Sequence, residues 1–160
     1  MNMTFSTMDK FHQALLLAFI AHRGQQDKSG EPYIYHPLRV MLSMVDSPEI
    51  FTEEMRIVAL LHDVVEDTRD RDDPVTVERI RITFGDEIAE AIDAITRRPS
   101  EPYPDYIARA KANKIARTVK MKDLNDNLDR MWKLIEAGQP NEARRLTNKY
   151  LDATTQLRER

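Results

Sequence analysis

A histidine followed directly by an aspartate lies in the middle of the segment LLHDVVEDT, residues 60–68. This pair is His62 and Asp63, and His36 upstream and Asp123 downstream offer side chains of the same two kinds. Imidazole and carboxylate groups together suit a divalent cation such as Mn²⁺ or Fe²⁺, and they leave coordination positions open for water or a substrate oxygen. The four residues therefore indicate a hydrolytic metal site.

Two more acids follow the pair by one helical turn. Glu66 is four residues after His62, and Asp67 is four residues after Asp63, so each pair would share a face of a continuous helix. The structural alternative is a packed histidine with solvated acids. However, the flanking residues are almost all apolar, which predicts burial in a helical bundle. An unpaired buried carboxylate costs several kcal/mol, so a cation is expected beside Asp63, either a metal ion or a basic side chain.

The composition suits one globular domain. The chain has 160 residues, of which 41% are hydrophobic, and its formal net charge is −3. This charge gives no general attraction to nucleic acid or to an anionic membrane, so an anionic ligand needs a local basic patch. The lack of cysteine excludes disulfides, thiolate catalysis and cysteine-ligated zinc. With no apolar run of about 20 residues, we expect a cytoplasmic protein without membrane or nucleic-acid partners.

The elements that must position the candidate ligands are helices and one polar loop. Apolar periodicity, capping residues and helix breakers mark their limits. The expected order is a loop at 25–35 that ends at His36, a helix starting at Pro37, a helix from a Thr52 cap to about Glu66, and a core helix at 112–134 that bears Asp123.

Other helices complete the expected bundle, with no strand and no internal repeat. They are a first helix from Phe11 to near Gly24 with a cap at Ser6 or Thr7, a segment with Ile80, Ile82 and Phe84 that stops at Gly85, a helix at 88–95, a proline-rich loop at 99–104, and a charged final helix at about 141–157.

Several short motifs follow one another in an order and spacing that carry a family resemblance. They are Gly24-Gln25, SGEPYIYHP at 29–37, LLHDVVEDT at 60–68, Phe84-Gly85, Thr96-Arg97 and VKMKDLNDNL at 119–128. Over about residues 11–134 the chain resembles the hydrolase domain of the HD superfamily found in Rel/Spo-type enzymes and in small alarmone hydrolases. The resemblance implies an all-α, single-domain HD-type helical bundle over residues 1–160 with a metal site in its core.

The resemblance also implies the activity. Such enzymes remove pyrophosphate from the ribose 3′ position of guanosine tetra- and pentaphosphate, the alarmones of the stringent response, with one Mn²⁺. Mn²⁺ is therefore the expected cofactor, with Fe²⁺ or Zn²⁺ as alternatives. The expected partner is a small phosphorylated nucleotide, and the oligomeric state is left open.

Site residues follow from the same resemblance. His36, His62, Asp63 and Asp123 match the metal ligands, and Glu66 and Asp67 match the acids that act on the attacking water. Lys28, Ser29 and Asn127 match positions that meet the nucleotide, although each could also be an ordinary loop or helix residue. The nearest cations for the phosphates of the nucleotide are Arg97, Arg98, Arg109, Lys111, Lys114 and Arg117. Arg97 and Arg98 have a structural alternative, because basic residues commonly close a helix C-terminus.

Departures from the family pattern concern the substrate. Asp27 stands where the family usually carries an arginine that stacks on guanine, and Asp126 and Asp129 are expected to make the pocket edge more negative. An adenosine counterpart of the alarmone is therefore a competing substrate. The other hypotheses are another nucleotide phosphohydrolase of the HD superfamily and a non-catalytic nucleotide-binding sensor or antitoxin-like module. The presence of both Glu66 and Asp67 favours an enzyme.

Overall fold

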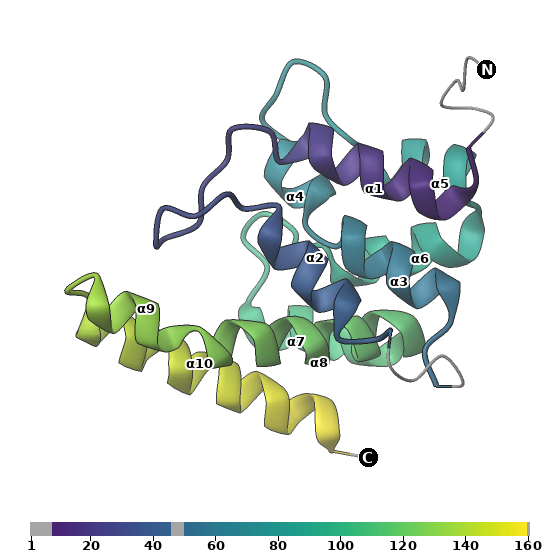
Figure 1. The fold of residues 1–160 in the computed structure, drawn as a ribbon. Coiled ribbons are helices and arrows are strands. Elements are labelled where there is room, and N and C mark those ends of the chain that lie inside the picture. Colours follow the sequence, from purple (N-terminus) through teal and green to yellow (C-terminus); the bar gives the residue numbers. More distant parts are fainter. Residues whose placement is uncertain (1–7, 46–49, 160) are drawn as a thin grey trace.

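The regular elements of the chain are all helices in the part that the structure, a computed structural model, describes, residues 8–45 and 50–159 (Figure 1). This confirms the expected all-α class. The helices are α1 (Lys10–Ala21), α2 (Tyr35–Leu42), α3 (Glu53–Leu61), α4 (Val64–Thr68), α5 (Val77–Phe84), α6 (Asp86–Ile95), α7 (Tyr103–Ala112), α8 (Lys114–Asp129), α9 (Met131–Glu136) and α10 (Pro140–Arg158). None of the helices described is long and apolar enough to cross a membrane.

Helix α3 lies at the centre of the bundle. It packs against α1, α2, α6 and α8, and every residue from Ile57 to Leu61 is buried. Thr52 caps its start by accepting a hydrogen bond from the Met55 amide, as the sequence predicted. Because the last turn of α3 is buried on all sides, the histidine and aspartate that follow it are carried into the interior.

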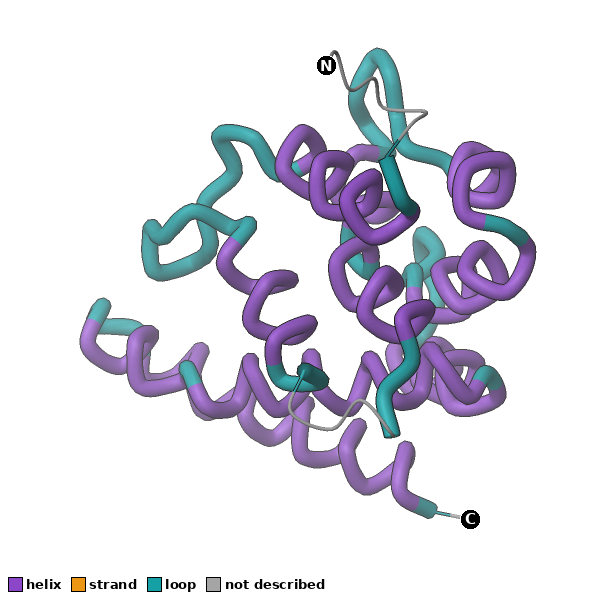
Figure 2. Tube along the Cα trace, turned by 45° about the vertical axis from the view of Figure 1, so that its right-hand side comes forward, coloured by secondary structure: helices purple, strands orange, loops and turns teal. Residues whose placement is uncertain are grey.

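Helix α9 continues α8 at its C-terminal end, and α10 runs back beneath both along one side of the bundle (Figures 1 and 2). Helix α10 packs against α7, α8 and α9. Its contacts form two small apolar clusters separate from the main core, one around Leu157 and Leu124 and one around Leu146 and Leu134. The final helix thus forms a second layer over α8, the helix that bears Asp123.

Helix α1 packs through small side chains. Ala14, Ala18 and Ala21 are buried, whereas the larger Phe19 and Ile20 are 48% and 59% exposed. The expected caps at Ser6 or Thr7 lie outside the described residues. The helix is capped instead by Asp9, whose carboxylate accepts a hydrogen bond from the His12 amide.

The expected continuous helix from Thr52 to Glu66 is wrong. Helix α3 ends at Leu61, and α4 begins only at Val64. At the break, Nδ1 of His62 donates to the Ala59 carbonyl at 2.8 Å. His62 and Asp63 therefore lie in a turn between two helices, and the histidine is fixed by its own backbone.

The expected core helix at 112–134 is also divided. Asn113 ends α7 and caps α8 by accepting from the Ala116 amide, and Arg130 separates α8 from α9. Smaller differences occur at the ends of other helices, since α2 starts at Tyr35 and α7 starts at Tyr103, inside the expected proline-rich loop. Asp123 nevertheless lies on an unbroken stretch of α8, which holds its position relative to α3.

Candidate active site

Four side chains from three parts of the fold converge on one point. His36 comes from α2, His62 and Asp63 from the turn between α3 and α4, and Asp123 from α8. Nε2 of His36 lies 3.2 Å from Nε2 of His62 and 3.1 Å from Oδ1 of Asp123. Oδ2 of Asp63 lies 3.0 Å from Nε2 of His62. The ligand atoms of His36, His62 and Asp123 lie within 4.8 Å of one another, which suits one cation, and all three residues are buried. Asp63 is not in this group of three, but its carboxylate adjoins the group through His62.

The partners of the two imidazoles fix their tautomers. Nδ1 of His36 lies 2.8 Å from a carboxylate oxygen of Asp126, and Nδ1 of His62 lies 2.8 Å from the Ala59 carbonyl. Both partners only accept hydrogen bonds, so each Nδ1 carries a proton and each Nε2 is the atom that faces the centre of the site. Two Nε2 atoms 3.2 Å apart, each beside a carboxylate oxygen, call for positive charge between them, which bound protons or a metal ion can supply. The residues present therefore fit a divalent metal ion.

The charges at this point agree with a cation site. Burial by itself would raise the pKa of Asp63 and Asp123, but the His62 imidazole and the Lys120 ammonium hold these pKa values well below the usual range. Burial would likewise lower the pKa of His36, but hydrogen bonds to Asp123 and Asp126 raise it to about 10. Ionised carboxylates thus outweigh the positive charge around the imidazoles, and a divalent cation would balance them.

Neighbouring side chains hold the ligands in place. The Asp123 carboxylate accepts hydrogen bonds from the Lys120 ammonium at 2.7 Å and from the side-chain Nδ2 of Asn127 at 2.6 Å. The Tyr33 hydroxyl donates to the Asp63 carboxylate. Asp126 receives two hydrogen bonds from Arg39, at 2.7 and 3.0 Å. The expectation that Asp126 adds negative charge to the pocket edge is therefore wrong, because this charge is paired with Arg39 and orients His36.

Glu66 and Asp67 both line the pocket beside this point. Oε2 of Glu66 accepts from the Arg97 amide at 3.1 Å, and Oδ2 of Asp67 accepts from the Gln25 side chain at 2.7 Å. Burial raises the pKa of both carboxyls, and the negative charge of Asp63 raises each further. Two half-buried carboxyls with raised pKa values are stronger bases towards a water molecule than exposed carboxyls are.

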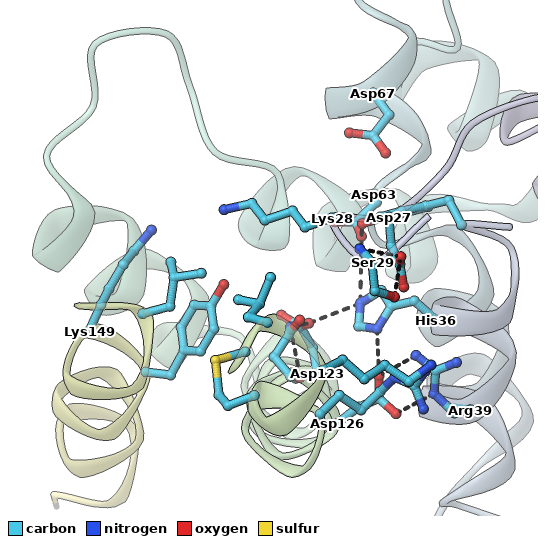
Figure 3. Close-up of a pocket in the computed structure, with 18 of the residues that line it drawn as sticks. Asp27, Lys28, Ser29, His36, Arg39, Asp63, Asp67, Asp123, Asp126 and Lys149 are labelled. Atoms are coloured by element: carbon cyan, nitrogen blue, oxygen red, sulfur yellow. Dashed lines mark hydrogen bonds and ion pairs between the residues drawn. The ribbon is translucent and has the colours of Figure 1, made fainter. Parts of the chain in front are cut away.

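The pocket has a volume of about 390 Å³ and reaches from the four ligands to α10. Figure 3 shows His36, Asp63 and Asp123 on one side and Lys149 of α10 on the other. Lys28, Ser29, Asn127 and Arg97 line the pocket, where the sequence placed them as substrate contacts.

Other cations named from the sequence lie elsewhere. Arg98 is not part of the lining, and its guanidinium pairs with Asp93 at 3.3 Å. Arg109, Lys111, Lys114 and Arg117 are absent from the lining too. Sequence reasoning missed five basic residues of the lining. They are Arg39 of α2, Lys120 of α8, and Arg130, Lys133 and Lys149 from the region of α9 and α10, where no motif marks the last three.

Asp27, which replaces the family's base-stacking arginine, organises the loop before α2. Its Oδ1 accepts from the Ser29 amide at 2.8 Å, the Ser29 hydroxyl at 2.7 Å and the Glu31 amide at 3.0 Å. The turn also needs Gly30, whose φ of +84° favours glycine. A carboxylate engaged in this way fixes Lys28 and Ser29 at the pocket rim.

Comparison with known proteins adds a family and named relatives. The HD domain family matches residues 14–145. The chain is 30% identical over 132 residues to the guanosine-3′,5′-bis(diphosphate) 3′-pyrophosphohydrolase of Aquifex aeolicus, covering 78% of this chain and 18% of that protein. It is 38% identical over 88 residues to the bifunctional (p)ppGpp synthase/hydrolase SpoT of Escherichia coli, covering 55% of this chain and 12% of that protein.

A solved structure has a similar fold. It is described as a metazoan ortholog of SpoT that hydrolyzes ppGpp and plays a role in starvation responses. The two structures superpose with a TM-score of 0.69 at 25% sequence identity, covering 94% of this chain and 86% of the other. The chain spans less than a fifth of the length of the two curated relatives above, and most of this solved structure.

Proposed function

The chain belongs to the HD domain family, and from that premise we propose that it is a metal-dependent hydrolase that releases pyrophosphate from the 3′ position of ppGpp-like nucleotides. Relatives named for this reaction support the proposal. The observation that carries it is the pair of imidazole Nε2 atoms that face each other, flanked by two carboxylates, at one end of a pocket otherwise rich in basic side chains.

The residues that would hold the ion are His36, His62, Asp63 and Asp123. A bound divalent cation would supply Lewis acidity at this end of the pocket. We propose Mn²⁺ from the family resemblance, with Fe²⁺ or Zn²⁺ as alternatives that metal exchange would separate.

Glu66 and Asp67 are proposed to take the proton of the attacking water and to return it to the leaving ribose oxygen. Each carboxylate has one oxygen engaged, by the Arg97 amide and by the Gln25 side chain respectively. Each therefore keeps a fixed orientation and a second oxygen for the water. Because burial raises both pKa values, proton transfer in either direction is less unfavourable at neutral pH than for an exposed carboxylate. The two acids favour an enzyme over a binding-only sensor.

Substrate contacts are proposed at Lys28, Ser29, Asn127 and Arg97, which line the pocket. The identity of the nucleotide base is proposed separately. Asp27 offers no planar cation that could stack on guanine, and its carboxylate is engaged within its own loop. The adenosine counterpart is therefore the second candidate substrate. The proposal includes a role in the stringent response and the cytoplasmic location expected from the sequence.

The test incubates the purified chain, loaded with Mn²⁺, with guanosine and with adenosine 5′-diphosphate 3′-diphosphate, and separates the products by chromatography. We expect wild type, but not Asp63→Ala, to release pyrophosphate, and the ratio of the two rates to give the base preference. Absence of release by a wild-type protein that elemental analysis finds loaded would contradict the proposal. Repeating the assay after chelation and reloading with Mn²⁺, Fe²⁺ or Zn²⁺ tests the choice of ion.

A further inference from the structure

The basic side chains of the pocket differ in whether a carboxylate already neutralises them. Seven line the pocket. Arg97 and Lys149 are the two for which the described residues provide no carboxylate within 4.0 Å. The other five each have such a partner, and they are Lys28 with Glu142, Arg39 with Asp126, Lys120 with Asp123, and Arg130 and Lys133 with Glu31.

Both unneutralised cations meet the same aromatic ring. Nζ of Lys149 lies 3.9 Å from the centre of the Tyr103 ring, and Cζ of Arg97 lies 5.8 Å from it. The Tyr103 hydroxyl is buried and has no hydrogen-bond partner among the described residues. Two cations and an unsatisfied hydroxyl therefore gather at one place in the pocket wall.

The field at Lys149 is unfavourable to its own charge. Burial lowers the pKa of Lys149, and the charges of Lys120 and Arg97 lower it further. An ammonium held among other cations and a buried hydroxyl without a partner are both costly when the pocket is empty. A ligand with negative charge and hydrogen-bonding oxygens would relieve both, which is the chemistry of a phosphate group.

We propose that Lys149 and Tyr103 form an anion-binding subsite that holds the 5′ phosphate groups of the nucleotide. This rests on the proposed function, in which the 3′ phosphates lie at the four ligands. A nucleotide with phosphates on both ribose positions has two anionic ends, and Lys149 stands across the pocket from His36 and Asp63 (Figure 3).

The test measures binding separately from turnover. GDP and guanosine are titrated calorimetrically into Mn²⁺-loaded wild type and Lys149→Met, with Lys149→Arg as the charge-conserving variant. Arg145→Met is the matched control, because Arg145 lies one turn earlier on α10, pairs with Glu142 and does not line the pocket. We expect Lys149→Met to weaken GDP binding about tenfold and to leave guanosine binding unchanged. Lys149→Arg and Arg145→Met should bind GDP nearly as wild type does.

Tyr103→Phe gives an independent readout. Removing a buried hydroxyl that no residue satisfies should raise the melting temperature of the ligand-free protein, whereas it should weaken GDP binding severalfold if the hydroxyl donates to a phosphate. Unchanged GDP affinity in both Lys149→Met and Tyr103→Phe would overturn the subsite.

Failure of the subsite and failure of the proposed function are distinguishable. GDP binding that depends on Lys149, without pyrophosphate release from any 3′-pyrophosphate, would sustain the subsite and reject the hydrolase. Pyrophosphate release with a KM that Lys149→Met does not change would sustain the hydrolase and reject the subsite.

Discussion

The two ends of the pocket differ in how completely the protein satisfies its own polar groups. At the end with His36 and Asp123, every ligand has a second contact, such as Asp126 on His36 and Lys120 on Asp123. At the opposite end, Lys149 has no carboxylate partner and the Tyr103 hydroxyl has no hydrogen-bond partner among the described residues. In the proposed function, the first end would be organised in advance for one ion, whereas the second end would be completed by the bound nucleotide.

This difference suggests a division of labour. Ligands held by several hydrogen bonds keep the geometry that the chemistry needs, and substitutions there should act on metal binding and turnover. Substitutions at the end with unneutralised charge should mainly change which anion binds and its affinity. Substitutions should therefore be able to change the two ends separately.

The largest effect is expected from removing a metal ligand. Asp63→Ala deletes the carboxylate that lies 3.0 Å from Nε2 of His62, so we expect loss of bound metal and of pyrophosphate release. The increase in melting temperature that Mn²⁺ gives wild type should also disappear, because an ion that binds only the folded state stabilises it. Metal content by elemental analysis, melting curves and product chromatography provide the three measurements. The exposed Asp72→Ala is the control, and an Asp63→Ala protein that keeps its metal would reject the ligand assignment.

The next effect separates chemistry from metal binding. Glu66→Gln keeps the shape of a side chain that accepts from the Arg97 amide but removes its charge. We expect metal content to be unchanged and kcat to fall by about 10²–10⁴-fold, the usual contribution of a general base. In wild type kcat should rise with pH through the raised pKa of Glu66, because the base must be deprotonated, and Glu66→Gln should lose this rise. Steady-state rates between pH 5 and 8 test it, with the exposed Asp70→Asn as control.

A smaller effect is expected one contact away from the metal. Asp126→Asn weakens the acceptor for Nδ1 of His36 and breaks the pair with Arg39. We expect metal affinity to fall by about 10–100-fold, as for other residues that orient a ligating histidine. Competition with a metal-binding dye measures it. Asp129→Asn is the matched control, since Asp129 is exposed and lies three residues later on the same helix. Equal effects of the two substitutions would mean that net charge, and not orientation, controls the affinity.

The sequence carried the information about the first end better than about the second. His62 and Asp63 are adjacent and lie in a distinctive apolar segment, so residue type and spacing were enough to predict their chemistry. The break between α3 and α4, where the side chain of His62 bonds to the Ala59 carbonyl, could not be predicted in this way. A hydrogen bond of this kind leaves no mark in hydrophobic periodicity, which still favoured a continuous helix.

Long-range pairing explains the other errors. The sequence suggested that Asp126 adds negative charge to the pocket. Its partner, Arg39, is 87 residues away in the chain, so the sequence does not show that this charge is paired. Nothing in the sequence marks Lys149 as a residue of the pocket, since a lysine on a charged final helix is usually solvated. Whether such a side chain faces solvent or a pocket is decided by how α10 packs on α7, α8 and α9, and the sequence of α10 alone does not contain that information.

The smallest effect concerns the loop that supports the second end. Glu101 receives hydrogen bonds from Arg109 at 2.8 and 3.0 Å and from the Arg98 amide at 2.9 Å, while its carbonyl accepts from Arg97. The bonds from Arg109 lower the pKa of Glu101 to about 2 from its ordinary 4.5. A lowered pKa in the folded state means that the stabilisation is present above the unfolded value and is lost as pH falls from about 4.5 towards 2. Solvent screening limits it to about 1 kcal/mol, or about 2–4 °C in melting temperature.

Glu101→Gln should therefore melt about 2–4 °C below wild type at pH 7, and the gap should narrow as the pH falls from about 4.5 towards 2, because the carboxyl of the unfolded wild-type chain then takes up a proton that the folded state does not bind. Melting curves of both proteins at pH 7, 5, 4 and 3 measure the gap directly. A gap that stays constant with pH would mean that Glu101 supports the loop through its shape and neutral hydrogen bonds. In that case the ordering of Arg97 and Tyr103 would not depend on charge, and the second end of the pocket would be as fully organised in advance as the first.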